Sequence, residues 1–480
     1  MTFARSRELG RYTSNTPESV MNHTNTIAMR RNLFYGILGL IFLGSVGLLF
    51  LTTQLGDSPH LIVSDGNGYY SWVRSLFIDG DLDFSNDFPL LYDPDPAPEL
   101  IITPKGLVHN KYPIGLAIIE IPGFLLGHFI AVLTPFPADG ISSPYQLSVA
   151  ISLTAFVIGS FALFYHSLRR FGVNESLAAT VSIALLLSTN LIHYYAKQST
   201  MAHGAGVAVL NLLLWLGTRQ PIPQMPSEEG QPFPSEQIKP SENNLSPELL
   251  KLGKDKTRFL QAIVLGLLSG LLVLVRNTHV VFLPFILFFN LKLLKSKLNF
   301  ICASLTFLMT VSLQKIALWL LWGEWVIYPY KNEEFKQGIE GLFLVLWGNS
   351  YGLFLYHPLY LLLVTINIMG LVKLKPYRGY FITILIAFFA LVAINGSWGN
   401  FGDSFGHRAF IETLPLLGFG AALTFQSYSP SLTQVKQGYA ILGLLILLNF
   451  YLWLGYVLQA YPHDMMRNLA QVYLWLFSVN

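Results

Sequence analysis

Long apolar runs, separated by short polar segments, repeat along almost the whole chain. A helix needs about 20 mostly apolar residues to cross the hydrocarbon core of a bilayer. Eleven runs predict such helices: 33–55, 146–168, 176–194, 200–217, 259–276, 278–294, 299–321, 351–372, 379–396, 409–426 and 437–458. We therefore expect an all-α polytopic membrane protein with about 11 transmembrane helices.

A twelfth apolar stretch, 114–132, has a different character. It contains Glu120, Pro122 and His128, which suit an interfacial or re-entrant helix better than a span. Lys and Arg are enriched in cytoplasmic loops, and this rule separates the two topologies. If 114–132 does not cross, most of the 30 Lys and Arg fall on the cytoplasmic side, whereas a crossing would place most of them outside. We therefore expect the non-crossing arrangement, with 56–145 as one long, mostly extended outer segment that carries surface helices.

Three polar or amphipathic segments complete the predicted organisation. Residues 1–32 predict a cytoplasmic N-terminal tail, and 33–480 predict one membrane domain whose first helix is not cleaved. Trp72, Leu76 and Phe77 have helical spacing and predict a helix on the bilayer surface over 70–80. The segment 219–257 is rich in Pro, Ser, Glu and Gln and predicts a disordered cytoplasmic loop.

The composition supports a membrane protein and excludes several other classes. Hydrophobic residues make up 52% of the chain and charged residues only 12%, against about 25% charged in soluble domains. The net charge of +3 is too small to indicate nucleic-acid binding. The single cysteine, Cys302, excludes an intramolecular disulfide and a metal site built from cysteines.

Two short polar segments, 64–70 and 398–408, are the strongest candidates for a functional site. They lie far apart in the sequence, yet the predicted topology places both on the outer face. Charged residues at the mouths of transmembrane helices are costly and indicate function. One acid surrounded by several cations suits phosphate chemistry, because the cations bind a phosphate leaving group while the carboxylate deprotonates an incoming hydroxyl.

The order of these motifs resembles that of the C-type glycosyltransferase (GT-C) superfamily, which includes protein O-mannosyltransferases and other membrane enzymes that use polyprenyl-phosphate sugars. Asp65-Gly66-Asn67-Gly68-Tyr69-Tyr70 is similar to the family's acidic motif in the first outer loop. Lys111-Tyr112-Pro113 is similar to its Lys-Pro-Pro segment, and 169–172 fits the inner end of the next helix. The segment 398–408 resembles the Gly-rich aromatic Gly-x-Arg motif of bacterial members. The family motif often has two adjacent acids, whereas Gly66 follows Asp65 here, so a divalent metal is possible but not required.

The resemblance implies roles for the candidate residues. Asp65 would be the general base in an inverting transfer, or a metal ligand, and its structural alternative is a helix cap. Lys111 would bind the donor phosphate as a point charge, or lie at the interface as a structural lysine. Arg408 with His407 would bind the phosphate, or Arg408 would pair with Asp403. The other predicted substrate-binding residues are Tyr69, Tyr70, His109, Tyr112, Arg276 and Asp403.

These features predict a glycosyltransferase of the plasma (inner) membrane. It would move a sugar from a polyprenyl-phosphate donor to a hydroxyl of a glycan, lipid or protein acceptor on the outer face. A transporter or flippase of lipid-linked saccharides is an alternative, which predicts an inner-face polar site and related halves. A polymerase or ligase of such saccharides is another, which predicts a large outer loop late in the chain.

Overall fold

The computed structural model describes residues 17–55, 60–92, 100–219, 247–327, 329–330, 335, 338–348, 352–398, 404–428 and 431–457. Over these residues the chain is helical and contains no β-strand. Eight helical segments of the described chain are long and apolar enough to cross a membrane. The protein is therefore an all-α polytopic membrane protein, as the apolar pattern predicts.

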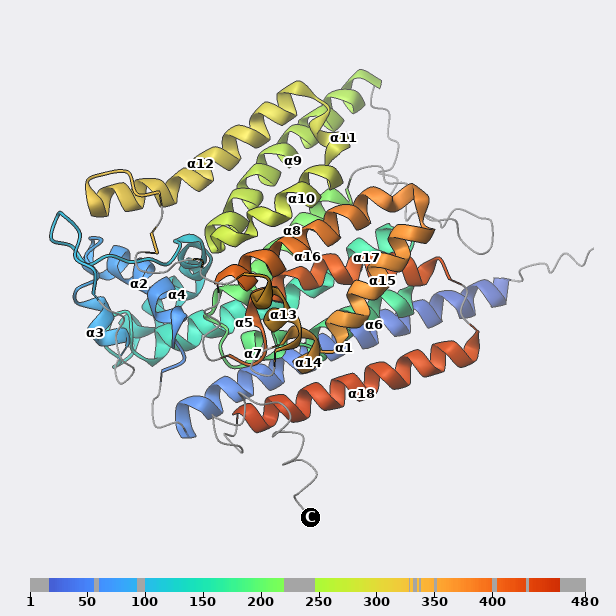
Figure 1. Ribbon diagram of the computed structural model, residues 1–480, viewed down its shortest axis with the longest axis horizontal. Helices are drawn as coiled ribbons and strands as arrows, with labels where there is room; N and C mark the ends of the chain where they lie inside the picture. Colours follow the sequence, from blue (N-terminus) through green and yellow to red (C-terminus); the bar gives the residue numbers. More distant parts are fainter. Residues whose placement is uncertain are drawn as a thin grey trace, which may run out of the picture.

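The helices lie alongside one another in one bundle, with α2, α3 and α4 gathered at one end (Figure 1). In chain order the elements are α1 (Pro17–Leu55), α2 (Asp65–Arg74), the π-helix η1 (Ser75–Asp79), α3 (Asp87–Leu91), α4 (Gly115–Leu133), α5 (Ser143–Arg170), α6 (Glu175–Leu187), α7 (Leu191–Ala196), α8 (Ala202–Gly217), α9 (Pro247–Val275), the 3-10 helix η2 (Asn277–Phe282), α10 (Leu283–Phe289), α11 (Leu291–Leu294), α12 (Lys297–Trp322), α13 (Ile339–Trp347), α14 (Leu353–Tyr356), α15 (Leu359–Lys373), the 3-10 helix η3 (Lys375–Tyr377), α16 (Arg378–Trp398), the 3-10 helix η4 (Arg408–Thr413), α17 (Leu414–Gln426) and α18 (Leu432–Val457).

Two ends of the bundle can be told apart by the contacts made there. At the Asp65 end, Gly66 of α2 lies against Thr200, which precedes α8. At the opposite end, the last residue of α17, Gln426, accepts a hydrogen bond from the backbone N–H of Asn174, which caps α6. Helices α8 and α17 therefore start at the Asp65 end and run away from it.

Helix α4 stays at the Asp65 end. A Cβ added at Gly115 would lie 2.4 Å from the backbone nitrogen of Val275, the last residue of α9. A Cβ added at Gly127 would lie 2.6 Å from Cα of Tyr145, in the first turn of α5. By length and composition alone, Gly115–Leu133 could cross a membrane. Since the start and the second half of α4 contact elements of the same end of the bundle, the arrangement favours the predicted non-crossing helix, which stays a prediction.

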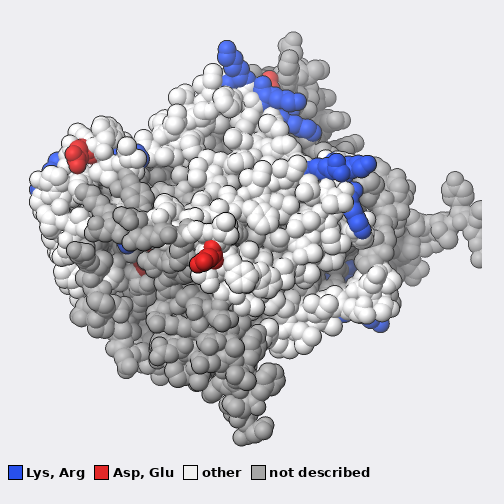
Figure 2. Space-filling model, viewed as in Figure 1, with Lys and Arg blue, Asp and Glu red and all other residues white. Residues whose placement is uncertain are grey.

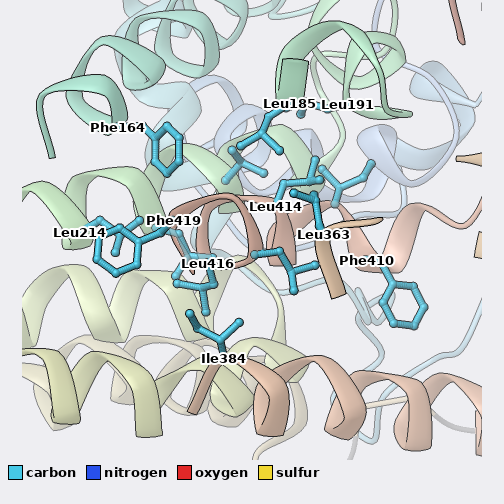
Figure 3. Close-up of a cluster of buried hydrophobic side chains, with 14 of the residues drawn as sticks. Phe164, Leu185, Leu191, Leu214, Leu363, Ile384, Phe410, Leu414, Leu416 and Phe419 are labelled. Carbon is cyan, nitrogen blue, oxygen red and sulfur yellow. The ribbon is translucent and has the colours of Figure 1, made fainter. Parts of the chain in front are cut away.

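The core surrounds α17, whose side chains are almost all buried. Figure 3 shows apolar side chains of α5, α6, α8, α15 and α16 converging on this helix. The labelled residues are Phe164, Leu185, Leu191, Leu214, Leu363, Ile384, Phe410, Leu414, Leu416 and Phe419. This packing fixes the position of η4, the short helix that leads into α17.

The predicted spans all contain helices, but several are broken. The span 176–194 divides into α6 and α7, and the carbonyls of Leu187 and Thr189 at the break accept hydrogen bonds from Asn449 of α18. A break inside a predicted span is tolerated because protein groups satisfy the freed backbone. The spans 278–294, 351–372 and 409–426 are also interrupted or begin as 3-10 helix.

The structure differs from the sequence analysis in four details, while the cytoplasmic tail 1–32, the outer segment 56–145 and the cytoplasmic loop 219–257 stay predictions. The outer segment 56–145 is mostly helical where the structure describes it, and α1 begins at Pro17, within the predicted tail. Helix α9 begins at Pro247, within the segment predicted to be disordered. The surface helix over 70–80 begins at Asp65, and Trp72 is buried rather than turned to a bilayer, with 1% of its surface exposed. Packing around Trp72 explains the last difference: its ring meets Phe84 edge-on, and its indole N–H donates to the Tyr112 carbonyl.

Candidate active site

Asp65 occupies the first turn of α2 and receives bonds from two distant parts of the chain. Its Oδ2 atom lies 2.8 Å from Nη2 of Arg408, and its Oδ1 atom accepts a hydrogen bond of 3.0 Å from the Tyr112 hydroxyl. The side chains of Asp65 and Arg408 expose 31% and 21% of their surfaces, so the pair is deep but accessible. Asp65 therefore binds other side chains instead of capping its helix.

The backbone before Asp65 is strained. Ser64 has φ 56°, the one positive φ of a non-glycine residue in the described part of the chain. Such a conformation costs on the order of 1–3 kcal/mol and clusters at functional sites. The Ser64 side chain makes no cap hydrogen bond that would offset the strain. The strained turn sets the direction in which α2 presents Asp65.

Two glycines let α2 approach its neighbours closely. A Cβ at Gly66 would lie 2.9 Å from Oγ1 of Thr200, and one at Gly68 would lie 2.0 Å from Cδ2 of Tyr112. The Tyr112 ring lies edge-on to Tyr69, with ring centroids 5.0 Å apart. Gly is a poor helix former, so its presence twice in one turn reflects the space that Thr200 and Tyr112 need.

The electrostatic surroundings keep Asp65 ionised. Burial raises the pKa of its carboxyl, but the Arg408 guanidinium and the Tyr112 hydroxyl outweigh burial and hold the pKa below its ordinary value. His203 and Arg276 lower the pKa further. The carboxylate is therefore charged at neutral pH and available to accept a proton or to bind a cation.

A second acidic group, Glu412, lies one turn after Arg408 on η4, and the sequence analysis missed it. Its side chain is only 1% exposed. Its Oε1 atom lies 3.0 Å from Nδ1 of His203, 3.1 Å from Nε2 of His279 and 3.5 Å from Nη1 of Arg276. The signal in the sequence was an acid inside the apolar run 409–426, since an ionisable residue inside such a run indicates function by default.

Three other predicted residues, Tyr69, Lys111 and His407, lie beside the group formed by Asp65, Tyr112 and Arg408. Tyr69 contacts Tyr112, and the Lys111 ammonium lies 5.6 Å from the centre of the Tyr112 ring. His407 is buried, and burial, together with the charges of Arg276 and Arg408, lowers its pKa to about 3. It is therefore neutral at physiological pH, so it can hydrogen-bond to a phosphate but adds no charge.

Tyr70 and His109 are not brought to the Asp65 carboxylate. Tyr70 is fully buried, and its hydroxyl donates to the Gly140 carbonyl. The His109 ring bonds to the Pro329 carbonyl and to the Trp322 indole. Both side chains are used in packing the Asp65 end of the bundle. Asp403 lies outside the described residues.

A metal site is not evident from the side chains that the structure describes. Among those residues, no group of three or more His, Cys, Asp or Glu could hold a metal ion. Asp65 has Arg408 and Tyr112 as its partners, which are not metal ligands of the usual hard kind.

The chain has a distant structural likeness to a known protein. No protein-family model matches the chain, and no curated protein matches it. Among solved structures it is similar to the apo form of the Archaeoglobus fulgidus oligosaccharyltransferase, with a TM-score of 0.44 and 12% sequence identity. The match covers 91% of this chain and 56% of that chain, so this chain spans little more than half the length of the archaeal protein. A likeness of this degree carries no argument about function.

Proposed function

We propose that the protein is a membrane glycosyltransferase that moves a sugar from a polyprenyl-phosphate donor to an acceptor hydroxyl. One observation carries the proposal. The Asp65 carboxylate, the Arg408 guanidinium and the Tyr112 hydroxyl come from three distant segments and form one hydrogen-bonded, accessible group. An accessible acid beside a guanidinium is the pairing that the transfer of a phosphate-linked sugar requires.

The reaction uses Asp65 as a general base. The acceptor oxygen forms a bond to the anomeric carbon, and its proton passes to the Asp65 carboxylate. The bond between that carbon and the phosphate oxygen breaks, and polyprenyl phosphate leaves with the electron pair. Attack from the face opposite the phosphate inverts the anomeric centre. The charge that grows on the leaving phosphate is stabilised by Arg408.

The same guanidinium couples donor binding to the strength of the base. Within the described part of the chain, Arg408 is bonded only through Nη2, which leaves N–H groups for phosphate oxygens. A bound phosphate neutralises part of the Arg408 charge. Because that charge is a main cause of the low pKa of Asp65, donor binding would raise the pKa and make the carboxylate a better base.

The distribution of basic residues supports a site on the outer face. Figure 2 shows Lys and Arg gathering at the end of the molecule away from α2 and α3. Basic residues enriched on one side of a membrane protein mark the cytoplasmic side. Those at the ends of α5, α11, α12, α15 and α16 are Arg169, Arg170, Lys292, Lys295, Lys297, Lys373, Lys375 and Arg378.

The packing below the site favours an enzyme over a transporter. A transporter needs a binding site that opens alternately to both sides. The polar group lies at one end of the bundle, and η4 continues into α17, which is enclosed by apolar side chains (Figure 3). Moving a saccharide past α17 would require this core to open.

The test is sugar transfer by purified protein from a panel of radiolabelled polyprenyl-phosphate sugars to membrane extracts that supply the acceptor. We expect one donor to be active with the wild type, and Asp65→Asn and Arg408→Ala each to lower the transfer rate by about 100-fold or more. Asp81→Asn makes the same isosteric change on the same segment, away from the site, and should leave the rate unchanged. Full activity in both site variants would refute the proposal, as would no transfer by the folded wild type from any donor.

A further inference from the structure

Glu412 is a buried acid at the Asp65 end, and an arginine and two histidines of other elements lie around it. The groups around its carboxylate come from the start of α8, the junction of α9 and η2, and η2 itself. A buried charge is costly unless it is paired. Glu412 is such a charge inside an otherwise apolar segment. Arg276 and the two histidines around it offset the cost of burying its carboxylate.

The surrounding backbone is built to admit this carboxylate. His203 and Gly206 lie three residues apart on α8, and therefore on one face of the helix. A Cβ at Gly206 would lie 2.8 Å from Cγ of Glu412 and 2.8 Å from Cε1 of His279. The His279 ring is in turn fixed by a hydrogen bond of 2.8 Å between Nδ1 and the Leu272 carbonyl. Only a glycine at position 206 leaves room for both side chains.

One edge of the Arg276 guanidinium is held by this group. Its Nη1 atom forms an ion pair with Oε1 of Glu412 at 3.5 Å. The same Nη1 atom lies 2.9 Å from Nδ1 of His203, a nitrogen that either accepts from Arg276 or donates to Glu412, but not both at once. The side chain is 23% exposed, whereas Glu412 is almost fully buried. Among the described residues no bond to Nη2 or Nε of Arg276 is present, so this second edge of the guanidinium is available to a ligand.

Arg276 also acts on the other half of the site. Its charge is one of the causes that lower the pKa of the Asp65 carboxyl. Arg408 and Glu412 are four residues apart on η4, so one short helix carries both the first arginine and the carboxylate that pairs with the second. The site thus contains two guanidinium groups, one paired with the accessible Asp65 and the other with the buried Glu412.

We propose that Glu412 is a positioning residue, which acts with His203 to hold Arg276 so that its second edge binds the phosphate of the lipid donor. Arg408 and Arg276 then bind the phosphate together. Glu412 never contacts the donor and acts through Arg276 alone. This inference rests on the proposed function for the identity of the donor, but the phosphate-binding role of Arg276 can be measured without any transfer.

The test is a double-mutant cycle on donor KM and kcat, with Glu412→Gln, Arg276→Ala and the double variant. We expect Glu412→Gln to raise KM about 10- to 100-fold, the effect of losing a hydrogen bond to a charged group. In the Arg276→Ala background, Glu412→Gln should change KM almost no further, because Glu412 acts on the donor only through the Arg276 side chain. The proposal would be overturned if the two substitutions raised KM by independent factors that multiply in the double variant. An unchanged KM in Glu412→Gln would also overturn it.

Two further variants keep the test decisive if Glu412→Gln does not fold. Glu412→Asp retains the charge and should restore part of the lost affinity. Gly206→Ala displaces Glu412 and His279 without removing a polar group, and should also raise KM. Glu175→Gln is the matched control, since Glu175 is a buried acid paired with Arg169 at the opposite end of the bundle. A rise in KM in this control equal to that in Glu412→Gln would show a general effect of losing a buried acid and overturn the proposal.

Binding of polyprenyl monophosphate that carries no sugar separates this inference from the proposed function. We expect the wild type to bind this lipid more tightly than uncharged polyprenol, and Glu412→Gln and Arg276→Ala to lose that preference equally. If this result appears but no sugar is ever transferred, the proposed function fails and the positioning role stands. If transfer occurs while Glu412→Gln binds the lipid phosphate like the wild type, the positioning role fails alone.

Discussion

Replacing Gly68 by Ala perturbs the Asp65 group without removing any polar atom from it. The new Cβ would lie 2.0 Å from Cδ2 and 2.3 Å from Cε2 of Tyr112. Carbon atoms in contact are separated by about 3.5–4.0 Å, so the ring must recede by roughly 1.5 Å. The ring is not free to do so, because the Tyr112 hydroxyl donates to Asp65 and the Tyr112 backbone carbonyl accepts from the Trp72 indole. Tyr112 and Asp65 must therefore move together.

A displacement of about 1 Å in a catalytic group can cost about 100-fold in rate. We expect Gly68→Ala to lower kcat/KM for sugar transfer by about 10- to 100-fold, while thermal unfolding shows a folded protein. Alanine favours an unhindered helix by about 1 kcal/mol over glycine, so the activity loss cannot come from helix propensity. Gly159→Ala in α5 is the control, because no atom lies within 4 Å of its new Cβ. The reasoning is refuted if Gly68→Ala costs as much in a Tyr112→Ala background, where the obstructing ring is gone.

Two other predictions concern the residues that position Asp65 and hold its charge. Ser64→Gly should relieve the positive φ and raise the unfolding free energy by about 1 kcal/mol, and an unchanged or lower melting temperature would contradict the strain. Tyr112→Phe should move the acidic limb of the kcat/KM profile to higher pH. Activity requires the ionised Asp65, and the lost hydroxyl is one of the groups that hold its pKa down. A limb at the wild-type pH would show that Asp65 does not set it, and Tyr145→Phe, whose hydroxyl bonds to His128 instead, is the control.

The helical architecture could be predicted because a bilayer imposes long apolar segments, and each predicted span contains a helix. The predicted topology placed Asp65 and Arg408 on the same face of the membrane, but it could not predict that the two side chains form an ion pair. Tyr69 and Tyr70 looked equivalent in the sequence, but successive residues of a helix point about 100° apart. Only Tyr69 therefore turns to Tyr112, while Tyr70 packs against Phe124.

Other features of the site depend on tertiary contacts that no local pattern encodes. Helix α2 forms through Gly66 and Gly68 against their low helix propensity, because its neighbours pack closely there. Glu412 was hidden inside an apolar run, and its partners His203, Arg276 and His279 come from the ends of three other elements. Local charge and periodicity could not reveal that these ends meet.

The measurement that tests the central claim most directly separates donor binding from chemistry in Asp65→Asn. With the active donor identified, binding of that donor and single-turnover transfer are measured in the same preparation. We predict that Asp65→Asn binds the donor at least as tightly as the wild type, since a negative charge beside the phosphate is removed, yet transfers its sugar about 100-fold or more slowly. Transfer at the wild-type rate by a variant that binds donor normally would contradict the role of Asp65 as the base.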